Sequence, residues 1–313
     1  MLRDLLDAPA EQVAAERARV ETEGWGACLL ALRDVDGHWD GGACFPRRIV
    51  DDWRAGIEPD FSNGQPWTST LPTLMLLRDL GPEPESPAAR TTIPLVAANC
   101  RWEHDGQAFF DGEVEPCING RTLSIGAYFG ADVDGLVSGL LDDQLDDGGW
   151  NCESENGATA SSFDSTICVL EGLLEYELSG GQVAVAASRR RGEEYLLERQ
   201  LFRRRSTGEV PSERWLQFSW PPRWHYDVVR ALDHFRRTGD APDERIAEAV
   251  QMVRDKRRPD GTWLLENTHP GETQFEFEDG DGQPSRWNTL RALRILDCTT
   301  TGGKPLTGLV LLT

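Results

Sequence analysis

The stretch Gln144-Leu145-Asp146-Asp147-Gly148-Gly149-Trp150 fits a short pattern: Gln or Arg, three residues, Gly, any residue, Trp. Residues 33–39 and 257–263 fit the same pattern, and all three copies carry Asp-Gly before the Trp. Weaker copies that lack the Trp occur at residues 105–109 and 206–210. Such recurrence indicates an internal repeat of five units.

Helical patterns flank the copies of this motif. Asp-Gly suits the end of a helix, because Gly accepts the left-handed backbone that closes it. We expect helices before the motif over residues 132–145 and 244–256. After a loop, a second helix with an apolar face is expected over 67–80, 117–129, 163–177, 224–237 and 287–297. No Val/Ile/Thr run alternates as a strand would, so the predicted class is all-α.

The composition is that of a globular protein. Apolar residues make up 39% and charged residues 27% of the 313 residues, enough to bury a sizeable core. Repeats that stack share one core, so we expect a single domain over residues 1–298, followed by a C-terminal tail over 299–313. Seven cysteines, an odd number in a long chain, are expected to be reduced thiols.

The charge balance excludes several classes of partner. Lys and Arg number 32 against 53 Asp and Glu, a formal charge of −21, which repels phosphate backbones and anionic membrane surfaces. No stretch reaches the ~18 apolar residues of a membrane span, and the first residues lack the apolar core of a signal peptide. We therefore expect a cytoplasmic protein that binds no nucleic acid and does not span a membrane.

The Gln/Arg-x-x-x-Gly-x-Trp repeats between paired helices resemble the motif of the squalene cyclase and protein prenyltransferase superfamily. The resemblance covers roughly residues 12–297. It implies an α/α toroid, a barrel of inner and outer helices, here with five to six helix pairs. It says much less about the reaction. The alternative is a superhelical array of helix pairs that serves as a binding surface.

In such toroids the inner helices point their N-termini toward the mouth of the central cavity, where the helix dipole favours negative charge. We align the inner helices on the bulky residues at their starts, with the second helix placed by its terminal glycine. In this alignment, the position that directly follows each bulky residue holds Thr68, Cys117, Asp164, His225 and Asn288.

Cys117, Asp164 and His225 are residue types that bind zinc, and a catalytic site uses three protein ligands with a fourth position open. Equivalent positions in successive repeats would bring them together. The set resembles the Asp, Cys and His zinc site of protein prenyltransferases, which activates a thiol. In that family Asp and Cys lie two apart on one segment, whereas Cys168 follows Asp164 by four residues. Cys152, after the strongest repeat motif, is a further candidate ligand.

Ordinary structural roles are the alternative for each of these residues. Asp164 is equally suited to cap a helix, Cys117 to pack in a core, and His225 to cap a helix or face solvent. Tyr226 and Asp227 follow His225 and are candidates to supply an acid or to orient the imidazole.

Aromatic residues at the helix starts predict an apolar substrate pocket, in which their faces would stabilise cations within ~6 Å. The alternative is that these residues pack as wedges between neighbouring repeats. Arg121, Arg223 and Arg286 lie near inner-helix starts and are available for an anionic group or for carboxylates of the chain. The expected pocket residues are Trp67, Thr68, Phe163, Trp224, Trp287, Asn288 and Arg121.

These observations predict a prenyltransferase- or terpene cyclase-like enzyme with zinc in its central cavity. It would act on an apolar or isoprenoid-like small molecule as a transferase, lyase or cyclase. One alternative is a metal-free, terpene cyclase-like enzyme that uses Asp164 or Asp227 as acid; another is a non-catalytic toroid that binds a hydrophobic ligand or a protein partner. The acidic loop over residues 276–282 would hold magnesium if it overhangs the cavity and the substrate is a diphosphate. Nothing in the sequence indicates a partner subunit.

Overall fold

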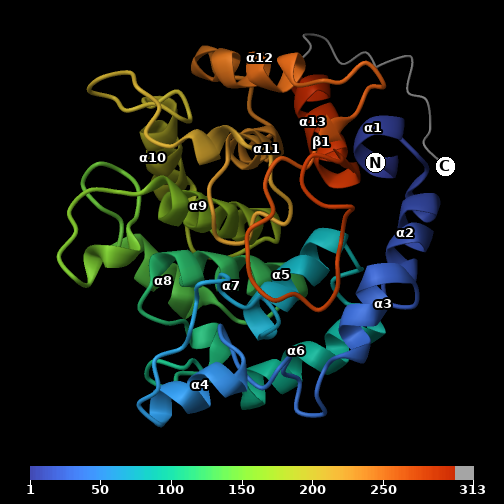
Figure 1. The fold of residues 1–313 in the computed structure, drawn as a ribbon, viewed down its shortest axis with the longest axis vertical. Helices are drawn as coiled ribbons and strands as arrows, with labels where there is room; N and C mark the ends of the chain where they lie inside the picture. Colours follow the sequence, from blue (N-terminus) through green and yellow to red (C-terminus); the bar gives the residue numbers. More distant parts are fainter. Residues whose placement is uncertain (300–313) are drawn as a thin grey trace.

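A computed structural model describes residues 1–299, and helices dominate them (Figure 1). The predicted all-α class is confirmed. The α-helices are α1 (Leu2–Leu6), α2 (Ala10–Arg19), α3 (Gly24–Ala31), α4 (Arg47–Arg54), α5 (Thr70–Leu80), α6 (Pro87–Asn99), α7 (Pro116–Phe129), α8 (Asp134–Asp142), α9 (Phe163–Leu178), α10 (Ala186–Leu197), α11 (Val228–Thr238), α12 (Ala247–Asp255) and α13 (Arg286–Thr299). The tail predicted over 299–313 lies outside the described residues, apart from Thr299.

Short elements complete this part of the chain. Two-residue strands β1 (Trp263–Leu264) and β2 (Pro284–Ser285) pair antiparallel, with Trp263 opposite Ser285. The 3-10 turns are η1 (Phe109–Asp111), η2 (Cys152–Ser154), η3 (Glu213–Leu216) and η4 (Glu244–Ile246).

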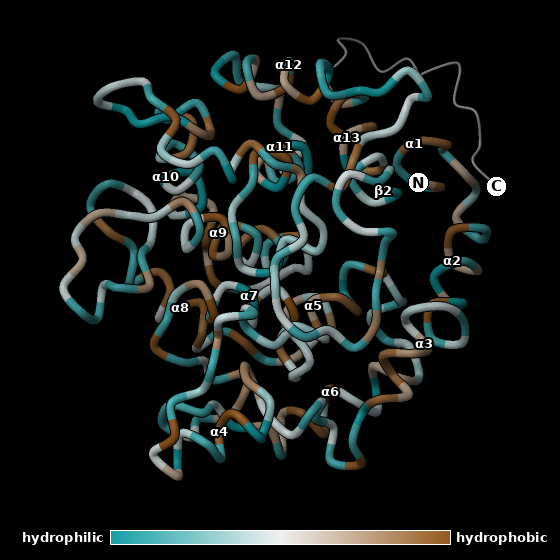
Figure 2. Tube along the Cα trace, in the orientation of Figure 1, coloured by the Kyte–Doolittle hydropathy of each residue, from teal (hydrophilic) through white to brown (hydrophobic). Residues whose placement is uncertain are grey.

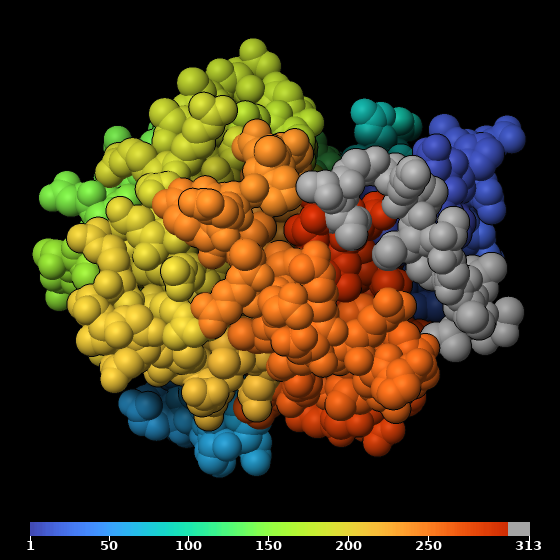
Figure 3. Space-filling view, turned by 90° about the horizontal axis from the view of Figure 1, so that it is seen from above, coloured from blue at the N-terminus to red at the C-terminus, as the bar shows by residue number. Residues whose placement is uncertain are grey.

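The helices alternate between an inner row and an outer layer. Helices α5, α7, α9, α11 and α13 contact one another in that order, and α6, α8, α10 and α12 lie outside this row (Figure 1). Helix α1 contacts both α2 and α13, so the N-terminal helices lie beside the end of the row, where their blue residues border the red of α13 (Figure 3).

The inner row forms the core. Twelve residues of α7, all those from Pro116 to Ala127, are buried, as expected for a helix surrounded on all sides. The hydrophobic colour in Figure 2 accordingly concentrates on helices, and the outer loops are hydrophilic. Helices α7 and α9 approach closely at Gly120 and Gly172, where a Cβ on Gly120 would lie 2.5 Å from the Cys168 carbonyl oxygen. Only glycine permits this approach.

The three repeat tryptophans make the same hydrogen bonds. The indole N–H groups of Trp39, Trp150 and Trp263 each donate to a carbonyl ten residues earlier, at 2.7 Å. Their backbone N–H groups donate to the hydroxyls of Thr70, Thr166 and Thr289 at 3.2, 3.1 and 3.0 Å. Each tryptophan therefore ties the chain before the motif to the inner helix after it.

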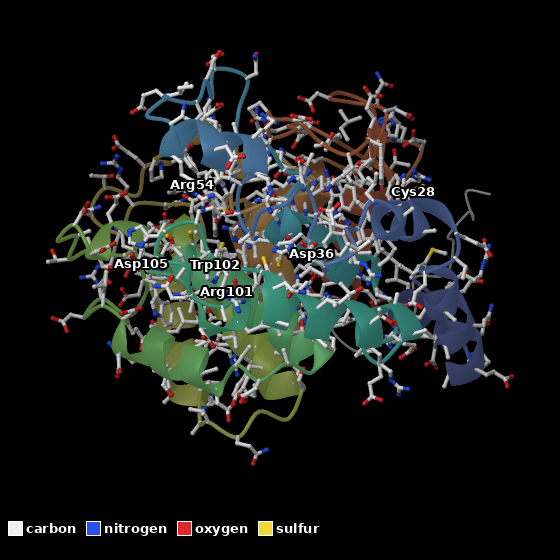
Figure 4. All side chains as sticks on the ribbon, turned by 90° about the horizontal axis from the view of Figure 1, so that it is seen from below. Cys28, Asp36, Arg54, Arg101, Trp102 and Asp105 are labelled. Atoms are coloured by element: carbon white, nitrogen blue, oxygen red, sulfur yellow. The ribbon has the colours of Figure 1, made fainter. Side chains whose placement is uncertain are left out.

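The glycine of the motif lies in the turn that precedes the tryptophan. Gly148 has a φ of 99°, which favours glycine, and an added Cβ would lie 2.7 Å from the Arg191 carbonyl oxygen on α10. In the weaker copy at 105–109 a tryptophan precedes the motif instead. Trp102 stacks on Phe109 at 4.9 Å, and Arg101, Trp102 and Asp105 lie together near the end of α6 (Figure 4).

The hydrogen bonds correct the alignment made from sequence at two helices. Thr70, Thr166 and Thr289 occupy equivalent positions in the three helices. The residues two positions before these threonines are Thr68, Asp164 and Trp287, not Asn288. Alignment on bulky side chains alone was therefore one residue out at the last helix. The helix expected from 224 begins only at Val228, because the Asp227 carboxylate accepts the Arg230 N–H at 2.7 Å and caps it. His225 therefore lies in the preceding loop.

Candidate functional site

A cluster of two thiols and one carboxylate forms where α7 begins. The ligand atoms of Glu115, Cys117 and Cys152 all lie within 4.8 Å of one another. Glu115 and Cys117 flank the first residue of α7, and Cys152 opens η2. The Cys117 thiol donates to the Glu115 carboxylate at 3.4 Å, and Cys117 is buried while Glu115 and Cys152 are half-buried.

Polar groups converge on the Cys152 sulfur. It accepts the Cys117 backbone N–H at 3.4 Å and the Ser165 hydroxyl at 3.1 Å, and the Cys152 N–H donates to the Ser165 oxygen at 3.0 Å. The contact with Cys117 lowers the pKa of Cys152, against the effect of burial. The same contact, together with burial, raises the pKa of Cys117. Donors aimed at the sulfur favour a thiolate at Cys152.

Two of the four predicted metal ligands meet in this cluster and two do not. Cys117 and Cys152 come together. The Asp164 carboxylate instead accepts the Tyr226 backbone N–H at 2.7 Å, and burial raises its pKa. Glu115 was missed. The signal was present in Glu115-Pro116-Cys117, whose acid lies two residues before the cysteine. Cys168 is fully buried one turn beyond Asp164, with its thiol 3.5 Å from the Trp224 carbonyl oxygen.

His225 belongs to a column of stacked rings. Its imidazole lies 3.7 Å from the Trp224 ring and 3.9 Å from that of His269. Burial, together with smaller effects of neighbouring charged groups, lowers the pKa of His225 to about 3 and that of His269 to about 4. Both imidazoles are therefore neutral at pH 7.

Because the pKa values of His225 and His269 are lowered, we expect the folded protein to lose stability in mild acid. Below pH ~6.5 the unfolded chain takes up protons on these two residues, whereas the folded chain does so only near pH 3 to 4. Stability from the pair is thus complete above pH ~6.5, and we expect the free energy of unfolding to fall by about 2 to 4 kcal/mol between pH 7 and pH 5. Urea denaturation at each pH measures it. A His225→Gln/His269→Gln variant should lose this slope, and an equal slope in both proteins would refute the assignment.

A cavity of about 980 Å³ runs beside the inner helices. Its apolar wall includes Trp67, Trp220 and Trp287, the last two stacked with ring centroids 4.5 Å apart. The polar wall is rich in arginine. The lining arginines are Arg3, Arg17, Arg78, Arg121, Arg223, Arg230, Arg236, Arg237, Arg291 and Arg294.

Three of the predicted pocket residues, Trp67, Trp287 and Arg121, line this cavity. The other four are engaged elsewhere. The Thr68 hydroxyl donates to Asp40 at 2.6 Å, and the Asn288 amide donates to the Phe218 and Leu264 carbonyls. Phe163 packs on Trp215 and Tyr226, and Trp224 stacks on His225.

The remaining catalytic candidates have structural partners. The buried Tyr226 hydroxyl donates to the Leu201 carbonyl. Asp227 accepts the Ser219 hydroxyl at 2.7 Å in addition to its capping bond. Arg286 lies over the Trp25 ring rather than in the cavity wall. The acidic loop over 276–282 contributes no residue to that wall either, so no magnesium site is assigned to it.

Comparisons with known proteins do not identify this site. No family model and no curated protein matches the chain. None of the helices described in residues 1–299 is long and apolar enough to cross a membrane.

Proposed function

We propose that the chain is an α/α-toroid enzyme, similar to the prenyltransferase and squalene cyclase superfamily, in which Glu115, Cys117 and Cys152 hold zinc beside a substrate cavity. The alternation of inner and outer helices and the equivalent bonds of the three repeat tryptophans support the toroid. A small apolar molecule suits the tryptophan-rich wall of the cavity.

The observation that carries the proposal is the convergence of three metal-binding groups at one helix start. Two thiolates and a carboxylate form a ligand set that suits zinc and leaves a fourth position open. Zinc–sulfur bonds of about 2.3 Å place sulfur ligands roughly 4 Å apart, which the 4.8 Å limit of the cluster accommodates. Bound there, zinc would supply a Lewis acid that keeps a thiol or water nucleophilic near neutral pH.

The cluster and the cavity lie on neighbouring turns of α7. The Arg121 Nε donates to the Cys117 carbonyl oxygen at 3.2 Å, and Arg121 lines the cavity. Residues four apart share one helix face, so Arg121 connects the wall of the substrate space to the cluster. Ser165 orients the Cys152 sulfur from α9. Neither Asp164 nor Asp227 lines the cavity, and the three cluster residues do not line it either. The metal-free acid mechanism is less favoured because these two carboxylates already accept hydrogen bonds, Asp164 from Tyr226 and Asp227 from Ser219 and Arg230.

Metal analysis tests the proposal. We expect about one zinc per chain, measured by plasma mass spectrometry on protein purified without a metal-affinity step. Cys117→Ser and Cys152→Ser should each weaken zinc binding by at least about tenfold, and Glu115→Gln should weaken it as well. Cys28→Ser is the matched control, since Cys28 is an exposed thiol on α3 (Figure 4). Zinc-free unmodified protein, or full zinc content in a Cys117→Ser/Cys152→Ser variant, would contradict the proposal.

A further inference from the structure

The two sulfurs of the thiol cluster lie close enough to react with each other. All seven cysteines of the chain are free thiols, and the sulfurs of Cys117 and Cys152 lie within 4.8 Å of each other. A disulfide needs its sulfurs about 2.05 Å apart, so an approach of about 3 Å or less would join the two.

The loop that carries Cys152 is placed to make this approach without a shift of the core helices. Residues 151–161 leave and rejoin the core at one point, where the Ser162 N–H donates to the Trp150 carbonyl oxygen at 2.9 Å. Cys152 opens the short turn η2 within that loop, whereas Cys117 belongs to the first turn of α7. Rotation about the Cα–Cβ bonds of the two cysteines, with a small shift of η2, would bring the sulfurs together.

Cys152 is the more accessible sulfur of the pair. It is half-buried, whereas Cys117 is only 7% exposed. The Cys152 sulfur accepts the Ser165 hydroxyl at 3.1 Å and, at the start of α7, the Cys117 backbone N–H at 3.4 Å. Such donors and the positive end of a helix dipole stabilise negative charge on sulfur. A sulfur in this setting is the kind that oxidants attack.

Zinc and a disulfide exclude each other at these two sulfurs. Zinc binds two thiolates at about 2.3 Å each, which keeps them roughly 4 Å apart. A disulfide brings the sulfurs to about 2.05 Å and removes their negative charge. Of the three groups in the cluster, only the Glu115 carboxylate would then remain as a ligand. Because a catalytic zinc site uses three protein ligands, oxidation of the pair would release the metal.

We propose that Cys152 is a site of oxidation by hydroperoxides, and that Cys117 converts the oxidised sulfur into a disulfide that expels zinc from the cluster. The expulsion of zinc rests on the proposed function, whereas the disulfide itself needs no metal. Peroxide would thus switch the centre off, and a thiol reductant would switch it on again.

The reaction has two steps. The Cys152 sulfur attacks one oxygen of hydrogen peroxide, the O–O bond breaks, and a sulfenic acid and one water form. The Cys117 sulfur then attacks the Cys152 sulfur, the S–O bond breaks, and the oxygen leaves in a second water. The two sulfurs lose two electrons, which reduce one peroxide to two waters. The two protons come from the thiols, or from solvent when the sulfurs are bound to zinc as thiolates.

Treatment of the purified full chain with hydrogen peroxide tests the proposal. Peptide mass spectrometry without reduction identifies the disulfide, and a colorimetric chelator measures released zinc. We expect a Cys117–Cys152 disulfide, an equal amount of released zinc, and recovery of both thiols with dithiothreitol. Cys152 should react at least about tenfold faster than the exposed thiol Cys28. Cys117 and Cys152 that remain thiols while Cys28 is oxidised, or a disulfide to Cys168 instead, would overturn the proposal.

Variants assign the role of each sulfur. In Cys117→Ser the sulfenic acid on Cys152 has no partner, so dimedone should label Cys152 at least about tenfold more than in the unmodified protein. Ser165→Ala removes a donor to the Cys152 sulfur and should slow its oxidation about tenfold. Cys28→Ser is the matched control and should change neither result. Equal dimedone labelling of Cys152 with and without Cys117 would contradict the assigned roles. Should a variant fail to fold, the disulfide measured in the unmodified protein decides.

Zinc content measured on the same samples separates this proposal from the proposed function. A Cys117–Cys152 disulfide formed in protein that never held zinc supports the oxidation site and contradicts the metal centre. Zinc-loaded protein that keeps both its metal and its thiols in peroxide supports the metal centre and overturns the oxidation site.

Discussion

Replacement of Trp150 by alanine is expected to lower the free energy of unfolding by about 3–5 kcal/mol, the usual cost of removing a large buried aromatic side chain. The ring is fully buried between the inner helix α9 and the outer helix α10, whose Gly192 leaves room for it. The indole N–H also satisfies the Leu140 carbonyl at 2.7 Å. Alanine thus leaves both a cavity and an unpaired acceptor.

Urea denaturation followed by circular dichroism measures this loss. Trp150→Phe should cost less than Trp150→Ala, since it keeps an aromatic ring and removes only the N–H donor and part of the volume. Trp53 on α4 is the matched control, because it is 38% exposed and Trp53→Ala should cost well under half as much. Equal losses at Trp150 and Trp53 would contradict the role assigned to the motif.

The same physics explains why the helix pairing could be predicted from sequence. A Trp that follows Asp-Gly at a helix end has a turn before it and a helix after it, so its burial between the two is a local consequence of the motif. The bonds from Trp39, Trp150 and Trp263 to three threonines repeat that local geometry. The helix predicted from residue 224 starts only at Val228, because Asp227 caps it. The apolar pattern that begins at Trp224 drew attention away from this capping residue.

The site was predictable only in part. Cys117 was expected in a ring with Asp164 and His225, and Cys152 was a further candidate from the loop after the strongest motif; the structure brings these two cysteines together with Glu115. The predicted set of Cys117, Asp164 and His225 assumed that every inner helix begins alike. The loop before α11 breaks that assumption and stacks His225 on His269 instead. Trp67, Trp287, Arg121 and Arg223 were predicted near a central pocket and do line the cavity. Its other arginines could not be foreseen, because the wall combines residues of α1 and α2 with the ends of the inner helices, and no sequence spacing encodes those contacts.

The second large loss of stability is expected when the buried ion pair between Arg230 and Glu171 is broken. The two side chains are 2% and 14% exposed and make two bonds, at 2.8 and 2.7 Å. We expect Arg230→Met to lower the free energy of unfolding by about 3–5 kcal/mol at pH 7, since it leaves a buried carboxylate without a partner. A second substitution, Glu171→Met, should restore part of that loss. Arg203→Met at the exposed pair with Glu248 should cost about 1 kcal/mol or less.

Acid distinguishes this electrostatic cost from lost packing. Burial raises the pKa of Glu171, but the charge and hydrogen bonds of Arg230 outweigh it and hold the pKa at about 2. A carboxyl with a lowered pKa stabilises the fold above its unfolded pKa, ~4.5, and loses that contribution as the pH falls toward 2. In Arg230→Met the hydrogen bonds and the largest opposing charge are lost, so burial raises the pKa of Glu171 against the remaining charge of Arg78. The carboxyl therefore takes up a proton at a higher pH than in the unmodified protein, and its buried charge disappears as the pH falls. The stability gap between the unmodified protein and the variant should therefore narrow from pH 7 to pH 4, whereas a gap caused by packing alone would stay constant.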